Sequence, residues 1–258
     1  RSFSRTQTFA NAPKAIDHAA FFGPDTLIHF DATTLNISGD RFYQMGKFDL
    51  AIQEYQKGLE LKPKDINLIN SLGVCYGVMG ELDKARQQFE SAMKINANEV
   101  MVVYNLGLLS QINSDTDKAI VYLRKAHGIN DRVFEVEVLL ARLLKQKNQP
   151  DAALKHLDAA AGVNPESAQV ARMKGEIFLE KKHPQDAARQ FNLAIKRNPS
   201  DAVSLSGYAK SLAMQNKNLN IALSFARNSL ALDPGNSTFK KRLAAIVDKI
   251  ENSSAEEQ

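Results

Sequence analysis

The side chains able to perform acid–base, nucleophilic or metal chemistry are few and scattered in this sequence. The five histidines form no i, i+4 pair and have no cysteine partner, which disfavours a metal site: His18, His29, His127, His156 and His183. Glu176 and Glu180 share one helix face, an arrangement more typical of a solvated surface than of a paired acid and base. No phosphate-binding loop, GxSxG nucleophile or dinucleotide motif is present. We therefore expect no enzyme, and no catalytic residue, metal or cofactor.

Composition narrows the class of protein further. Cys75 is the single cysteine among 258 residues, which excludes an internal disulfide, fits a reducing compartment and favours a small buried residue over a reactive thiol. Basic and acidic side chains number 33 and 29 and are interspersed, so the net charge of +4 does not favour nucleic-acid binding. No stretch approaches the roughly 18 apolar residues of a membrane span. We expect a cytoplasmic protein that binds neither nucleic acid nor membrane.

A helical repeat must position whatever surface the chain uses, and its clearest copy runs from Ile66 to Glu99. Positions 4, 7, 8 and 11 of this stretch follow i, i+3, i+4, i+7 spacing, the pattern of a buried helical stripe. Small residues at 20 and 27 and an aromatic at 24 indicate a second helix. The residues are Ile69, Leu72, Gly73, Tyr76, Gly80, Ala85, Phe89 and Ala92. This pattern resembles the 34-residue tetratricopeptide repeat (TPR).

The register recurs along the chain. The residues at position 20 are spaced 34, 34, 34, 34 and 35 apart: Ala51, Ala85, Ala119, Ala153, Ala187 and Ala222. We therefore expect six repeats, at 32–65, 66–99, 100–133, 134–167, 168–201 and 202–235, with one extra residue near 216–218 in the last. The TPR resemblance implies an all-α fold in which helix–turn–helix units stack into a right-handed superhelix, an α-solenoid. Residues 236–251 are predicted to form a capping helix, and residues 252–258 a disordered tail.

Residues 1–31 lie outside the repeat. Pattern predicts a helix over 12–22 and a strand over 26–30. Ala15, Asp17, Ala19, Ala20, Gly23 and the 27–30 strand resemble the C-terminal end of a GGDEF, or diguanylate-cyclase-like, domain. The GGDEF signature itself is absent, so no cyclase activity transfers to this chain. Because the sequence opens at Arg1 without methionine, we interpret it as part of a longer protein, in which this segment is either the remnant of an upstream domain or folds back on the first repeat.

The TPR resemblance also implies a concave groove lined by the first helix of each repeat. We predict that the amides of Asn36, Asn70 and Asn105, with Tyr104, hold the backbone and apolar groups of a peptide. Four basic residues further along would pair with its acidic side chains: Arg142, Lys145, Arg172 and Lys210. No three consecutive repeats carry the pattern of lysines and asparagines that clamps the C-terminal tail of a chaperone.

Two classes of function follow from this reading. The leading prediction is a module that binds a peptide or protein partner, with the ligand crossing from the second to the fifth repeat. The alternative is a self-associating scaffold. Regulation of an upstream cyclase-like signalling domain is a third possibility that depends on the GGDEF resemblance alone.

Overall fold

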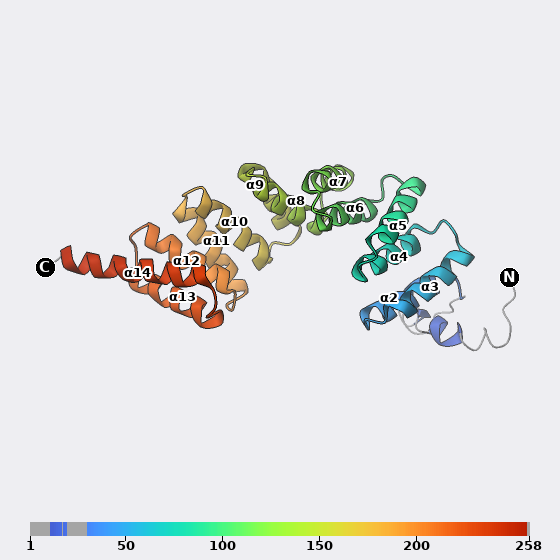
Figure 1. Ribbon diagram of the computed structural model, residues 1–258, viewed down its shortest axis with the longest axis horizontal. Helices are drawn as coiled ribbons and strands as arrows, with labels where there is room; N and C mark the ends of the chain where they lie inside the picture. The colour runs from blue at the N-terminus through green and yellow to red at the C-terminus, as the bar shows by residue number, and fades with distance from the viewer. Residues whose placement is uncertain (1–10, 17, 20–29, 257–258) are drawn as a thin grey trace. The chain divides into compact units, whose positions relative to one another are not determined.

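A computed structural model describes residues 11–16, 18–19 and 30–256, with side chains given up to residue 252. Helix is the main element of this part of the chain, and it contains no strand (Figure 1). The helices up to residue 130 are α2 (Ala32–Gln44), α3 (Phe48–Leu61), α4 (Ile66–Val78), α5 (Leu82–Ile95), α6 (Val100–Ile112) and α7 (Thr116–Ile129). Those that follow are α8 (Phe134–Gln146), α9 (Pro150–Val163), α10 (Ala168–Glu180), α11 (Pro184–Arg197), α12 (Ala202–Met214), α13 (Leu219–Leu232) and α14 (Ser237–Glu256). The all-helical prediction is confirmed for these residues.

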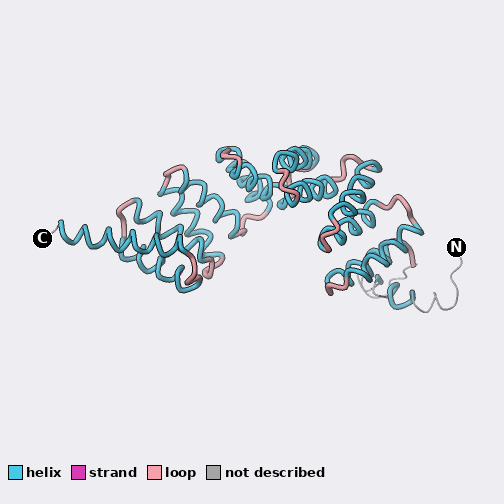
Figure 2. The backbone as a smooth tube through the Cα atoms, in the orientation of Figure 1, coloured by secondary structure: helices cyan, strands magenta, loops and turns pink. Residues whose placement is uncertain are grey.

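The helices form two compact units, Arg1–Asn130 and Asp131–Gln258. Within each unit, consecutive helices pair as hairpins: α2 with α3, α4 with α5 and α6 with α7 in the first, and α8 with α9, α10 with α11 and α12 with α13 in the second (Figure 2). Each hairpin lies inside one of the six 34-residue ranges expected from the sequence. The first helices also contact their counterparts, so that α2, α4 and α6 adjoin in one unit and α10, α12 and α14 in the other. These neighbouring first helices form the surface that we call the groove face of each unit.

The repeat register is confirmed by burial. All six alanines at position 20 are 0% exposed. The residues at position 24 are at most 4% exposed: Tyr55, Phe89, Leu123, Leu157, Phe191 and Ala226. A helix crossing therefore occupies the same place in every repeat.

The glycine at position 8 is needed because the position-24 side chain lies directly on it. A Cβ added at Gly39 would be 2.3 Å from the Tyr55 ring, and one at Gly73 would be 2.6 Å from the Phe89 ring. Where position 24 is the smaller Leu157, position 8 is Ala141. In these three repeats the volumes at the two positions therefore compensate each other. Phe191 lies against two glycines, because Cβ atoms added at Gly175 and Gly207 would be 2.9 and 2.4 Å from its ring.

The turn inside each hairpin uses a left-handed residue at position 15. Gly46 and Gly80 have φ values of 71° and 80°, and the corresponding residues of later repeats also have positive φ: Ser114, Asn148, Lys182 and Asn216. The extra residue of the sixth repeat lies in this turn, where Asn218 is left-handed as well, at φ 51°. Glycine adopts this conformation without steric cost, whereas serine and lysine do not.

The segment before the first repeat packs against it. Residues 11–16 and 18–19 are helical, in agreement with the helix expected there. Lys14 Nζ lies 2.5 Å from Glu54 Oε2, and His18 Nδ1 lies 2.8 Å from Thr34 Oγ1. The strand expected at 26–30 falls outside the described residues, apart from Phe30, which is not in a strand. These contacts support the interpretation that the segment folds back on the first repeat.

Helix α14 covers the end of the last hairpin. Ile246 is 1% exposed and packs with Ala222 and Ala226 of α13, joined by Leu243. The helix continues to Glu256, beyond the end expected at residue 251, so residues 252–256 are not the disordered tail that the sequence suggested. Residues 257–258 lie outside the described part. The polar residues at 252–254 include no glycine or proline, so nothing in their backbone chemistry ends the helix earlier.

Candidate functional site

The groove face of the first unit contains an apolar hollow of about 350 Å³. Its walls come from Tyr43 of α2, from α4 and α6, and from Phe89 of α5 below. The complete lining is Tyr43, Val74, Gly77, Val78, Phe89, Asn105, Leu108, Leu109 and Ile112. Val78 and Ile112 are each 53% exposed. Large apolar side chains are thus held at the surface around a concavity, which is typical of an interaction site.

The asparagines expected to hold a peptide backbone are occupied or buried. Asn105 Nδ2 donates a 2.8 Å hydrogen bond to Asn70 Oδ1, which joins α6 to α4 beneath the groove face. Asn36 is half-buried, and its Oδ1 is buried without a hydrogen-bond partner among the described residues. Tyr104 is half-buried on α6 and does not line the hollow. Of these four predicted residues, the structure brings only Asn70 and Asn105 together, and only Asn105 reaches the hollow.

The row of cations expected in the second unit is largely an internal charge network. Lys145 Nζ lies 2.8 Å from Glu176 Oε2 and 3.0 Å from Glu180 Oε1, so α8 and α10 are linked. Burial lowers the pKa of Lys145, but the two carboxylates outweigh it and raise the pKa overall. The charge of Lys145 is therefore already paired within the protein, and its contact with a ligand stays a prediction.

Arg172 belongs to the same network. Its Nη1 lies 3.4 Å from Asp201 Oδ1, and its Nε lies 3.9 Å from Glu176 Oε1. Asp201 is also the N-cap of α12, where its side chain accepts from the backbone N–H of Val203. Arg172 thus helps to fix the start of a helix. Among the four predicted cations, Arg142 and Lys210 are the exposed ones.

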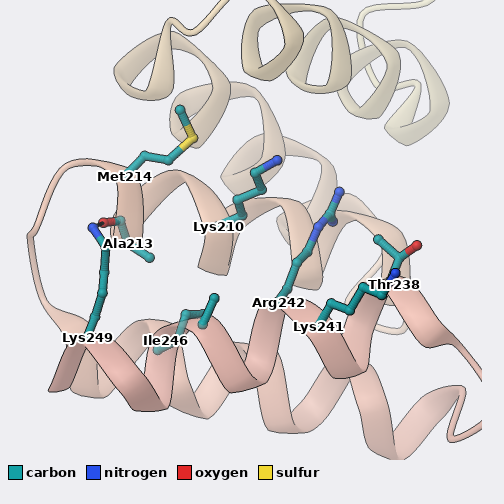
Figure 3. Close-up of a pocket in the computed structure, with 9 residues that line it drawn as sticks. Lys210, Ala213, Met214, Thr238, Lys241, Arg242, Ile246 and Lys249 are labelled. Carbon is teal, nitrogen blue, oxygen red and sulfur yellow. Dashed lines mark hydrogen bonds between the residues drawn. The ribbon is translucent and has the colours of Figure 1, made fainter. Parts of the chain in front are cut away.

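A second hollow of about 350 Å³ lies between α12 and α14 (Figure 3). Its lining is Lys210, Ala213, Met214, Thr238, Lys241, Arg242, Ala245, Ile246 and Lys249. Helix α14 starts 35 residues after α12, so Thr238, Lys241 and Ala245 occupy positions 2, 5 and 9 of a seventh first helix. These are groove positions. Sequence reasoning missed this part of the site because α14 was interpreted only as a cap, although the spacing contained the signal.

Figure 3 shows the side chains of Lys210 and Arg242 extending toward the same side from neighbouring helices. Arg242 Nη1 donates a 2.9 Å hydrogen bond to Ser206 Oγ. Lys249 Nζ donates to the backbone oxygen of Ala213 at 2.7 Å and to Asn216 Oδ1 at 2.6 Å. A smaller hollow of about 270 Å³ adjoins Lys210 and Arg242 and contains Glu176 and Glu180. The groove face of the second unit therefore passes from a mixed-charge region to a basic one.

Some of the described titratable groups outside the groove have structural roles. Cys75 is 0% exposed, and burial raises the pKa of its thiol to about 11, so it stays protonated at neutral pH. Glu137 is also 0% exposed, and its Oε2 lies 2.7 Å from His156 Nδ1. The Tyr55 hydroxyl donates a 2.8 Å hydrogen bond to Asp40 Oδ1. Each of the two hydrogen bonds holds a helix pair together through a buried polar contact.

The paired helices and the groove face define the class as a TPR-type helical repeat. Two family comparisons agree: residues 138–202 match the family described as tetratricopeptide repeat, and residues 39–80 match one described as TPR repeat. These two stretches of the chain are therefore tetratricopeptide repeats. Neither match includes residues 11–30, and the resemblance of that segment to a GGDEF domain is not supported. A comparison with curated proteins gives no match.

Solved structures share the fold at low sequence identity. Pseudomonas aeruginosa PilF superposes with a TM-score of 0.75 at 18% identity, over 83% of this chain and 96% of that one. PilW, a type IV pilus biogenesis factor, gives 0.68 at 15% identity over 82% and 98%. YrrB, a TPR protein with an unusual peptide-binding site, gives 0.64 at 16% identity over 72% and 96%. Within the described residues, none of the helices combines the length and apolar character needed to cross a bilayer.

Proposed function

We propose that this protein binds a segment of a partner protein on the groove face of its repeats. The observation that carries the proposal is the apolar hollow of the first unit, where Val78 and Ile112 remain 53% exposed. A ligand side chain that covers them removes apolar surface from water, at about 25 cal/mol per Å² buried. Helices that dock in grooves and extended peptides both use apolar anchors of this kind. The existence of a peptide-binding site in YrrB, which shares the fold, is consistent with this use of the repeats.

For the polar part of recognition, our proposal uses fewer residues than the sequence prediction. Asn70 and Asn105 bond to each other, and Lys145 and Arg172 pair with carboxylates of the protein. In our proposal they keep the first helices aligned. Arg142 and Lys210, which are exposed, are the predicted residues that remain for direct contact with a ligand.

The test is selection of peptides from a displayed random library on the full chain. Binding of the enriched peptides is then measured by fluorescence anisotropy. Val78→Glu and Ile112→Glu should each weaken binding at least about tenfold, because a carboxylate would be desolvated in the hollow. Val121→Glu is the matched control. Val121 is 66% exposed on α7, the second helix of the third repeat, and does not line the hollow. Failure to enrich any peptide, or equal affinity for all three variants, would contradict the proposal.

Self-association is the alternative: Ile16 of the N-terminal segment is 68% exposed and would favour it, but the C-terminal end of the array does not. The side of α14 that a further helix would cover presents Lys240, Ala244 and Asp248, which are exposed and small or polar. A surface of this composition supplies little apolar area for end-to-end packing. Light scattering over a range of concentrations separates the two functions, because a scaffold would grow in mass with concentration.

A further inference from the structure

The hollow between α12 and α14 combines an apolar floor with a basic rim. Its floor includes Ala213, Ala245 and Ile246, and its rim includes Lys210, Lys241 and Arg242. We propose that this hollow recognises an acidic protein segment, in which one apolar side chain enters the floor and flanking carboxylates pair with the three cations. The inference builds on the proposed function, and it assigns the chemistry of the ligand at the C-terminal end of the groove face.

The three cations make no direct ion pair within the described residues, unlike six other basic residues of the same unit. Elsewhere in the unit, carboxylates pair with Lys145, Arg172, Lys174, Lys181, Arg189 and Arg197. Lys210, Lys241 and Arg242 make no ion pair with any residue that the structure describes, and the lining of the hollow contains no carboxylate. The positive charge at this place is therefore not compensated by a direct contact with the protein's own described side chains. A ligand carboxylate would supply the missing partner.

Arg242 gives this charge a fixed position. The residue is half-buried, and its guanidinium is anchored to Ser206, which is 1% exposed. Burial disfavours the charged guanidinium and lowers its pKa, and the negative charge of Glu176 offsets this effect only in part. An incoming carboxylate would relieve this electrostatic cost, and a guanidinium presents a planar set of donors that suits a carboxylate. Lys249 is different, because its ammonium group already donates to Ala213 and Asn216.

The apolar floor of the hollow favours an acidic segment that also carries an apolar side chain. Ala213 and Ala245 are short, so the floor between α12 and α14 stays open to about 350 Å³. Met214 lies at the edge and is 39% exposed. Methionine is flexible and adapts its shape to different apolar groups. A free inorganic anion would satisfy the rim and leave this apolar floor in contact with water.

The same composition favours a protein segment over a nucleic acid. The lining contains no aromatic side chain on which a base could stack. The chain as a whole carries a net charge of only +4, with acidic residues interspersed among basic ones. Glu176 and Glu180 lie in the adjoining hollow and would repel a continuous phosphate backbone. A short acidic segment needs to cover only the basic part.

The experiment uses the full chain and two labelled synthetic peptides. One has a central leucine flanked on both sides by glutamates, and the other has glutamines in place of the glutamates. We expect the glutamate peptide to bind more tightly, and its affinity to fall as salt is raised. Lys241→Glu should weaken its binding about three- to tenfold, because an attraction becomes a repulsion. Lys240→Glu is the matched control, since this neighbouring lysine is exposed and does not line the hollow.

Two further measurements keep the result unambiguous. Arg242→Gln tests the anchored cation, with circular dichroism to show that α14 remains folded, and Lys210→Glu tests the rim from α12. The library selection described above supplies the second arm: peptides enriched on the wild type should carry acidic residues beside an apolar one, and Lys241→Glu should remove that preference. Peptides that enrich and depend on Val78 but show no acidic preference would overturn this inference and leave the proposed function standing. No enrichment at all would contradict the proposed function itself.

Discussion

Substitution of Gly73 by alanine tests the compensation between positions 8 and 24. The added Cβ would lie 2.6 Å from Phe89 Cε1 and 2.9 Å from Cδ1, whereas carbon atoms in good contact are about 3.5–4.0 Å apart. The ring must therefore retreat by about 1 Å. Val102 and Leu106 restrict this movement on their side, because Phe89 is 4% exposed and packs against them, while the ring also lines the hollow of the first unit. Overpacking of this kind costs about 1–3 kcal/mol.

Helix propensity acts in the opposite direction and must be subtracted. Alanine is favoured over glycine inside a helix by about 1 kcal/mol, so Gly73→Ala should destabilise the protein by about 0–2 kcal/mol. Gly77→Ala is the control in the same helix, because its added Cβ meets nothing closer than Ala85 Cβ at 3.9 Å. That variant should gain stability, by up to about 1 kcal/mol near the end of α4. If Gly77→Ala gains the full amount, the difference in stability between the two variants is about 1–3 kcal/mol, the cost of overpacking alone.

Urea denaturation followed by circular dichroism, with hydrogen exchange on α4, measures this difference. The exchange data are needed because repeat arrays unfold in parts. A double variant, Gly73→Ala with Phe89→Leu, copies the pairing of Ala141 with Leu157 in the fourth repeat. It should recover about 1–2 kcal/mol relative to the sum of the single changes. Equal stability of the two glycine variants, with no coupling in the double variant, would refute the argument.

Three further predictions concern the turns, the N-terminal contact and the last helix. Ser114 is left-handed, at φ 62°, so Ser114→Gly should stabilise the protein by about 1 kcal/mol. Asn113→Gly is the control and should not stabilise it, because Asn113 has a φ of −77°. Equal shifts of the melting temperature in the two variants would contradict this prediction. Burial opposes ionisation of Glu54, but its two lysine partners outweigh burial and hold its pKa below 4.5. The contact of Glu54 with Lys14 is therefore fully stabilising above pH 4.5 and is lost as the pH falls through the lowered pKa. Hydrogen exchange of residues 11–16 should rise in that acidic range, and it should also rise at neutral pH in Glu54→Gln but not in Glu60→Gln. Deletion of residues 236–258 should expose Ala222 and Ala226 and cause aggregation, whereas deletion of 253–258 should not. If the protein that ends at residue 235 stays monomeric with unchanged helicity per residue, α14 is not needed.

The sequence predicted the repeats well because their cause is local and periodic. Every repeat must bury a small residue at position 20, and the six alanines show that requirement directly. Position 15 was harder to interpret, because Ser114 and Lys182 adopt the left-handed conformation that glycine normally marks. At this position the hairpin imposes the left-handed backbone conformation, and the residue present adopts it at some steric cost.

The site was less predictable because side chains on a helix surface choose among several partners. Asn70 and Asn105 are 35 residues apart and find each other, and Lys145 finds Glu176 and Glu180. Spacing places such residues on the correct face without telling whether a neighbouring first helix or a ligand satisfies them. The basic hollow at α14 was missed for another reason, since a helix interpreted as a cap was not also considered as a groove helix.

The position of the Phe191 ring limits how these repeats could be recombined. One ring occupies space left open by Gly175 in its own repeat and by Gly207 in the next. Gly207 stands at position 6, where the other repeats have Ile37, Ser71, Asn105, Leu139 and Met173. A chimera that placed any of those repeats after the fifth would set a side chain against this ring. Duplication or shuffling of single repeats is therefore restricted at this junction. The fifth and sixth repeats would have to be transferred together.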